Sequence, residues 1–157
     1  RHLKKENENF VLDLVGFFED EYKEQVKELE KHSIAHFYGF QSDPRPFYIE
    51  ADCVVLPSYH EGMSNVILEA AATGRPVITS NIPGCRESVE NGKSGLLVEV
   101  KNKEMLYDAM KEMLHCSREE REQMGQAGRE KMEREFRKEV VVEKTVQSLR
   151  EDEKRDF

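Results

Sequence analysis

The sequence predicts an α/β fold: a Rossmann-like open parallel sheet with helices on both faces, followed by extra C-terminal helices. Short, continuously apolar segments alternate with stretches of helical periodicity from residue 10 to about residue 111. Strands that are apolar throughout are typical of parallel sheets covered on both faces, and right-handed crossovers make such a series an open, doubly wound sheet. We treat residues 1–157 as one domain, with a core over about 10–115 and C-terminal helices over about 118–150.

Each element has its own signal along the chain. β-branched, aromatic and leucine residues bounded by Gly or Pro predict strands over 10–16, 34–38, 53–56, 76–79 and 95–98. Helical periodicity between and after them predicts helices over 20–31, 46–51, 64–73, 102–115, 118–135 and 136–150. Glu alternates with Lys and Arg in the last two, which is typical of solvated helix faces. The residues before the first strand resemble the end of a helix, so we expect the chain to start within a βα unit.

Composition narrows the class of function. With 32 acidic and 24 basic residues the net charge is −8, which argues against a nucleic acid or an anionic membrane surface as the ligand of this domain. No apolar run approaches the roughly 20 residues that span a bilayer, and residues 1–5 do not resemble a signal peptide. The three cysteines are far apart, so we expect reduced thiols in a cytoplasmic protein, with Cys53 and Cys85 as buried apolar side chains.

The segment 57–69 is the most informative part of the chain. It joins the carboxyl end of a predicted strand to a predicted helix, which is where open α/β sheets bind ligands. Ser64 is the predicted N-cap, and the free N–H groups behind it suit a phosphate or a sugar hydroxyl. Gly62 lets a ligand approach the backbone. Glu61 and Glu69 frame this turn, and a carboxylate can accept two hydroxyl donors of a ribose or hexose.

The segments around this turn resemble the C-terminal domain of the family 4 retaining glycosyltransferases, which have the GT-B fold. The pair Glu61 and Glu69, separated by seven residues, matches the family's hallmark. The flanking matches are Ala51-Asp52, Gly74-Arg75-Pro76-Val77-Ile78, Pro83-Gly84-Cys85-Arg86-Glu87 and Asn91-Gly92-Lys93-Ser94-Gly95-Leu96-Leu97-Val98. The set is specific, although no single motif is, and weaker similarity extends from Phe10 to about Phe136.

The resemblance implies a role for each matching residue. Glu61 resembles the glutamate that contacts the donor sugar near the reacting centre and is the expected catalytic residue. Glu69 resembles the glutamate that holds the ribose diol. The other expected donor-binding residues are Gly62, Met63 and Ser64 through their backbone N–H groups, Asn65 beside them, Gly39, Phe40 and Gln41 around the base, and Gly16 and Phe17 in the same crevice.

The resemblance also implies the reaction and its partners. We expect a sugar to move from a nucleotide-diphosphate donor with retention of configuration, without a cofactor or metal. The motifs are most similar to bacterial O-antigen and lipopolysaccharide enzymes, which implies UDP-GalNAc as donor, an undecaprenyl-diphosphate-linked sugar as acceptor and an α-1,3 linkage. The acceptor domain, and the family's Arg and Lys that grip the diphosphate, have no match here. We therefore expect an inactive isolated domain, and a full-length enzyme held peripherally at the inner face of the cytoplasmic membrane.

Alternatives stay open at this stage. A UDP-GlcNAc 2-epimerase-like enzyme shares the fold, and a non-catalytic nucleotide-binding or interaction domain fits the charged C-terminal helices. His60 is expected to be an exposed loop residue rather than a base, and Arg86 a surface ion-pair residue. His32 and His36 straddle a helix end and a strand start, which argues against a metal site. Core packing is the expected role of Met105, Met110 and Met113.

Overall fold

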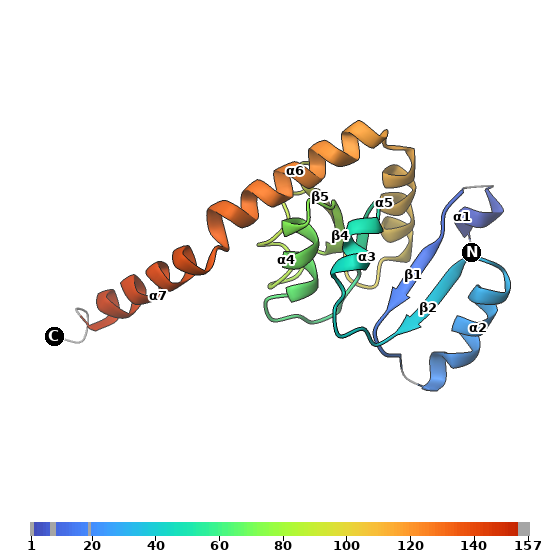
Figure 1. The fold of residues 1–157 in the computed structure, drawn as a ribbon, viewed down its shortest axis with the longest axis horizontal. Helices are drawn as coiled ribbons and strands as arrows, with labels where there is room; N and C mark the ends of the chain where they lie inside the picture. Colours follow the sequence, from blue (N-terminus) through green and yellow to red (C-terminus); the bar gives the residue numbers. More distant parts are fainter. Residues whose placement is uncertain (1, 7–8, 19, 154–157) are drawn as a thin grey trace.

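The computed structural model describes residues 2–6, 9–18 and 20–153 and has a layered α/β architecture (Figure 1). Its elements follow in this order: α1 (His2–Lys5), β1 (Leu12–Val15), η1 (Asp20–Tyr22), α2 (Lys23–Lys31), β2 (Ala35–Gly39), α3 (Arg45–Glu50), β3 (Val54–Leu56), α4 (Asn65–Ala72), β4 (Val77–Ser80), β5 (Gly95–Val98), α5 (Lys103–His115), α6 (Arg118–Glu135) and α7 (Lys138–Glu153).

The strand pairing confirms the predicted fold class. Every recorded ladder is parallel, as strand–helix–strand connections require. The strands form two sheets, one of β1 and β2 and one of β3, β4 and β5 in that order. Within the described residues, no strand pairing joins β1 to β3. The sequence predicted each strand and helix but not this division, because apolar periodicity reports that a strand is buried and not which strand it pairs with.

Side chains of the three-stranded sheet alternate between two apolar clusters, one on each face. Towards α3 and α4, the first cluster joins Tyr48, Ile67, Ala70, Val77, Cys85 and Val89, with Val54, Leu56 and Leu97 packed against it. Towards α5, the second joins Ile78, Leu96, Val98, Ala109 and Met113, with Val55, Leu106 and Met124 packed against it. Successive residues of a strand point to opposite faces, so each of the three strands serves both layers.

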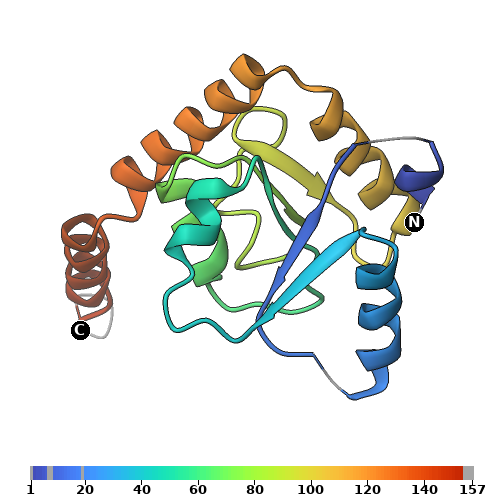
Figure 2. The same ribbon diagram turned by 45° about the vertical axis from the view of Figure 1, so that its right-hand side comes forward.

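Helix α6 closes the layer above α4 and leads into α7 (Figures 1 and 2). It begins with a capping box, in which the Ser117 hydroxyl accepts from the Glu120 N–H and the Glu120 carboxylate accepts from the Ser117 N–H. Gly125 lets α6 approach the turn after α4, where a Cβ at this position would lie 1.9 Å from the carbonyl oxygen of Gly74. Helix α7 extends away from the body of the molecule, and its apolar Val142, Val146 and Leu149 are exposed.

The N-terminal unit, which comprises α1, β1, η1, α2 and β2, contacts the remainder of the molecule through α5. Glu6 accepts hydrogen bonds from the Lys111 ammonium, at 2.6 Å, and from the Tyr107 hydroxyl. Helix α2 packs on β2, and Phe18 meets Phe37 edge to face at 4.6 Å. Across residues 2–6, 9–18 and 20–153, no helix combines the length and the apolar character needed to cross a membrane.

Replacing Gly125 by Ala tests the contact between α6 and the α4 turn. The added methyl group overlaps backbone atoms of Gly74, which cannot rotate away as a side chain could, so α6 has to shift. We expect the free energy of unfolding to fall by about 1–3 kcal/mol in chemical denaturation.

Gly128→Ala is the matched control on the same helix. Its Cβ would lie 3.5 Å from the Cβ of Ala71, which is an ordinary contact. Alanine also favours the helix over glycine, so stability should stay unchanged or rise by up to about 1 kcal/mol. Equal losses in the two variants would contradict the close-approach account.

Candidate functional site

The loop between β3 and α4 presents the first predicted carboxylate. Glu61 is partly buried, and its Oε1 accepts a hydrogen bond from the Ser58 hydroxyl at 2.8 Å. Ser58 follows directly after Pro57 at the end of β3, so its position is set by the sheet. The bond holds one oxygen of Glu61 and leaves its other lone pairs for further donors.

Helix α4 presents the second carboxylate in its second turn. The Tyr48 hydroxyl on α3 donates to Oε2 of Glu69 at 3.1 Å. Tyr48 is buried in the first cluster, while Glu69 is exposed. Burial raises the pKa of Tyr48 to about 12, and the hydrogen bond and negative charge of Glu69 act in the same direction. The phenol is therefore neutral at physiological pH and acts as a donor towards the carboxylate.

The loop after β4 packs against the turn between β3 and α4. Gly84 approaches Gly62 so closely that a Cβ on Gly84 would lie 1.4 Å from the Gly62 carbonyl oxygen. The Gly84 N–H donates to Oε2 of Glu87 at 2.7 Å, and the Ser88 hydroxyl contacts the Met63 sulfur at 3.6 Å. The loops after β3 and β4 thus hold each other in place at one edge of the sheet.

Ser64 lies at the N-cap position of α4 but does not cap it with its side chain. Its backbone is extended and its residue is buried, yet its hydroxyl accepts no hydrogen bond from the first turn of α4. Its own N–H donates to the Gly84 carbonyl at 3.4 Å. The predicted N-cap position is therefore confirmed, but the Ser64 hydroxyl does not provide the capping hydrogen bond. Asn65 follows as an exposed first residue of the helix.

The residues predicted to lie around the base gather at the carboxyl ends of β1 and β2. The Gly16 N–H donates to the Gly39 carbonyl at 2.9 Å. Phe17 and Phe40, 85% and 62% exposed, stack at 5.1 Å between ring centroids. The Gln41 carboxamide donates to the Tyr38 carbonyl at 2.7 Å, which fixes its orientation. Exposed, stacked aromatic rings beside polar groups can contact a planar base.

A ring contact links this aromatic group to the glutamates. Tyr38 of β2 meets Phe47 of α3 at 4.9 Å between ring centroids, and the next residue, Tyr48, reaches Glu69. Short helix α3 therefore contacts β2 through Phe47 and α4 through Tyr48.

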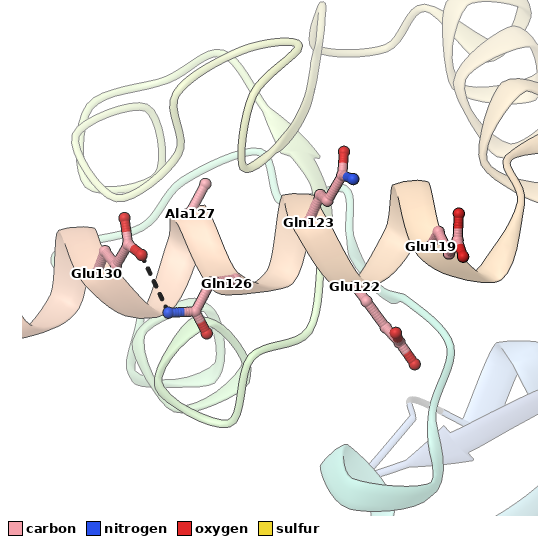
Figure 3. A pocket seen from close by; sticks show the side chains of 6 residues that line it. All are labelled: Glu119, Glu122, Gln123, Gln126, Ala127 and Glu130. Atoms are coloured by element: carbon pink, nitrogen blue, oxygen red, sulfur yellow. Dashed lines mark hydrogen bonds between the residues drawn. The ribbon is translucent and has the colours of Figure 1, made fainter.

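Two hollows on the surface of the described residues lie away from both glutamates. The larger, of about 500 Å³, runs along α6 and is lined by Glu119, Glu122, Gln123, Gln126, Ala127 and Glu130 (Figure 3). Its three carboxylates repel an anionic ligand. A second hollow of about 300 Å³ includes Asp52 and Arg75, which precede β3 and β4, so it lies at the amino ends of these strands. Neither includes Glu61 or Glu69.

Comparison with known proteins identifies the family of the chain. The family model described as "Glycosyl transferases group 1" matches residues 1–131 of the 157. The chain belongs to the group 1 glycosyltransferases.

Two curated relatives of the chain are bacterial enzymes. The capsular polysaccharide biosynthesis glycosyltransferase CapM of Staphylococcus aureus is 33% identical over 102 residues, which cover 65% of this chain and 27% of CapM. The N,N'-diacetylbacillosaminyl-diphospho-undecaprenol alpha-1,3-N-acetylgalactosaminyltransferase of Campylobacter jejuni is 35% identical over 98 residues, covering 62% of this chain and 26% of that enzyme. The chain thus spans about a quarter of the length of these relatives.

Solved structures show the same GT-B architecture. Sucrose-phosphate synthase from Thermosynechococcus elongatus superimposes with a TM-score of 0.76 at 28% sequence identity. The match covers 89% of this chain and 38% of that structure. The fold expected from the resemblance is therefore confirmed.

The structure also tests the expectations for residues outside the glutamate site. His60 is exposed, and Arg86 pairs with Glu87 at 3.8 Å, both as predicted. Cys85 is fully buried, and burial, with the charges of Glu61 and Glu87 adding to it, raises the pKa of its thiol. Met105 differs from the prediction: it is 38% exposed and its sulfur accepts from the Glu99 N–H at 3.3 Å.

Sequence reasoning missed three residues that organise the glutamate site. Tyr48 and Gly84 are far from Glu61 and Glu69 in sequence, so only the fold brings them together. Ser58 lies three residues before Glu61, and a hydroxyl at this short spacing is a local signal that could have identified it.

Replacing Gly84 by Ala tests the contact between the two loops. Gly84 has φ +87°, and its Cβ would overlap the Gly62 backbone, so the variant combines local strain with a clash. We expect the free energy of unfolding to fall by more than about 2 kcal/mol in chemical denaturation.

Gly92→Ala separates the two causes. Gly92 has φ +75° but open space around the position of a Cβ, so only the backbone strain remains, about 1–2 kcal/mol. If the two variants lose the same stability, the close approach of Gly84 to Gly62 is not what holds the loops.

Proposed function

We propose that this chain is the donor-binding part of a retaining glycosyltransferase of the family 4 type, which uses a UDP-sugar. The observation that carries the proposal is the pair of glutamates at the β3–α4 turn. One oxygen of each accepts from a hydroxyl on a neighbouring segment, at 2.8 Å for Glu61 and 3.1 Å for Glu69. Carboxylates held in this way keep free lone pairs for the hydroxyls of a nucleotide sugar.

Each part of the site has a task in the proposed reaction. Glu69 accepts the ribose hydroxyls, and Glu61 accepts hydroxyls of the donor sugar near the reacting carbon. The N-terminus of α4, with backbone N–H groups of Gly62 and Met63 close by, attracts the diphosphate. The bond between the anomeric carbon and the diphosphate oxygen breaks, and a bond to the acceptor oxygen forms on the same face. The acceptor hydroxyl gives its proton to the departing diphosphate oxygen, and UDP leaves with its remaining negative charge stabilised by these dipoles.

The proposed substrates follow from the relatives. The Campylobacter enzyme is named for an alpha-1,3 transfer of N-acetylgalactosamine to an undecaprenol-diphosphate-linked sugar. We therefore propose GalNAc as the donor sugar, a lipid-diphosphate-linked saccharide as acceptor, and a role in O-antigen or polysaccharide synthesis at the inner face of the cytoplasmic membrane. The acceptor is held by residues outside this chain, so the isolated domain binds donor without transferring the sugar. No metal takes part in the proposed step.

Saturation-transfer NMR with UDP, UDP-GalNAc, UDP-GlcNAc, UDP-glucose and GDP-mannose tests this proposal. Uridine and sugar protons of one UDP-sugar should receive saturation from the protein. Glu69→Ala should raise the Kd of that donor about tenfold or more, because hydrogen bonds to a charged group are lost.

Glu119→Ala is the matched control, since it removes an exposed carboxylate on the outer face of α6. It should leave the signals unchanged. Equal saturation in the wild type and Glu69→Ala would place the nucleotide elsewhere on the molecule, and selective binding of GDP-mannose would replace UDP by GDP in the proposal.

A further inference from the structure

We propose that Tyr48 is a positioning residue for the ribose site: its hydroxyl holds the Glu69 carboxylate in the orientation that receives the ribose diol. This inference rests on the proposed function and adds a residue that does not itself touch the donor. It would make α3 part of the machinery that recognises the nucleotide.

The first argument is the contrast in burial between the two partners. Tyr48 is 7% exposed and packs in the cluster that covers the α4 face of the sheet. Glu69 is exposed on α4, and a free glutamate side chain samples several rotamers that are lost on binding. The 3.1 Å bond from a buried, immobile hydroxyl restricts these rotamers before the ligand arrives. Preorganisation of this kind raises affinity without a new contact to the ligand.

The second argument is the anchoring of α3. The neighbour of Tyr48 on one side, Phe47, meets Tyr38 edge to face, and the carbonyl of Ile49 on the other accepts from the Arg75 guanidinium at 2.5 Å. The helix starts at Arg45, whose N–H and side chain both donate to the Asp43 carboxylate. Tyr48 is thus held from both sides, so its hydroxyl has a defined position relative to Glu69.

The third argument is the polarity of the bond. Tyr48 has one hydroxyl proton, and with its pKa raised to about 12 it keeps that proton over the whole neutral range. An ionised carboxylate only accepts, so Oε2 of Glu69 accepts the hydrogen bond from the phenol and Oε1 keeps its lone pairs for other donors. Within the described residues, Tyr48 donates the only hydrogen bond to the Glu69 side chain. The nearby Arg45 directs its guanidinium to Asp43, at 2.7 and 2.8 Å.

The experiment compares binding of UDP and 2′-deoxy-UDP by NMR titration to the wild type and Tyr48→Phe. A phenylalanine ring keeps the packing and removes only the hydroxyl. The wild type should prefer UDP over 2′-deoxy-UDP by about tenfold, the size of a hydrogen bond to a charged group. In Tyr48→Phe the preference should fall to about threefold or less, with UDP losing affinity and 2′-deoxy-UDP nearly unaffected.

Tyr107→Phe is the matched control. Its hydroxyl also donates to a glutamate, Glu6, but at the contact between the N-terminal unit and α5. This variant should keep the preference of the wild type for the ribonucleotide, which separates the effect from a general loss of stability.

The outcomes separate this inference from the function on which it rests. An unchanged preference in folded Tyr48→Phe overturns the role of Tyr48 and leaves the donor site standing. A wild type that binds neither nucleotide, or does not distinguish them, overturns both the ribose role of Glu69 and the inference.

A second measurement tests the bond without any ligand. Glu69→Gln removes the negative charge that helps to raise the Tyr48 pKa, so this pKa should move down from about 12 in an alkaline ¹³C-tyrosine NMR titration. No movement would show that the phenol does not sense Glu69 in solution and would overturn the proposal.

Discussion

Burial of β4 between two helical layers is the constraint on which the rest of the structure depends. All four of its residues are buried, and its two apolar side chains divide between the clusters, with Val77 in the first and Ile78 in the second. Its neighbours β3 and β5 pair with it in register, and the Thr79 hydroxyl adds a bond to the Leu56 carbonyl at 2.8 Å. Because β3 and β4 run parallel, their carboxyl ends lie side by side, and the loops that carry Glu61 and Gly84 must meet.

From this constraint the site follows in two steps. First, the loops after β3 and β4 pack together through the close approach of Gly84 to Gly62. Second, each glutamate accepts a hydrogen bond from a hydroxyl on a neighbouring segment. Both supports are neutral donors, Ser58 and Tyr48, rather than cations. A cation at that place would neutralise the carboxylate and occupy it, whereas a hydroxyl orients it and leaves acceptor capacity for a ligand. Each glutamate is therefore oriented by a neutral donor and keeps acceptor capacity for further hydroxyl groups.

The fold could be predicted to a large extent because its signals are local. Continuous apolar strands and helical periodicity depend on neighbouring residues, and the strand at 95–98 and the helix at 118–135 have their predicted bounds. Contacts between segments distant in sequence could not be predicted in this way: the Ser64 N–H donates to the Gly84 carbonyl in the loop after β4, and no local pattern around Ser64 indicates this bond. The separation of β1–β2 from β3–β4–β5 likewise depends on pairing, which no periodicity records.

By itself the sequence determined the order of elements, the family and the two glutamates, since the pattern around Glu61 and Glu69 lies within a single loop and helix. The tertiary structure alone decided how these carboxylates are held. Tyr48 precedes Glu69 by 21 residues and belongs to another helix. Their hydrogen bond therefore exists only because α3 and α4 pack against each other in the fold. Gly84 reaches Gly62 only across the parallel pair β3–β4. The residue types of the site can be read from one short segment of sequence, but their geometry depends on packing between elements that are distant in sequence.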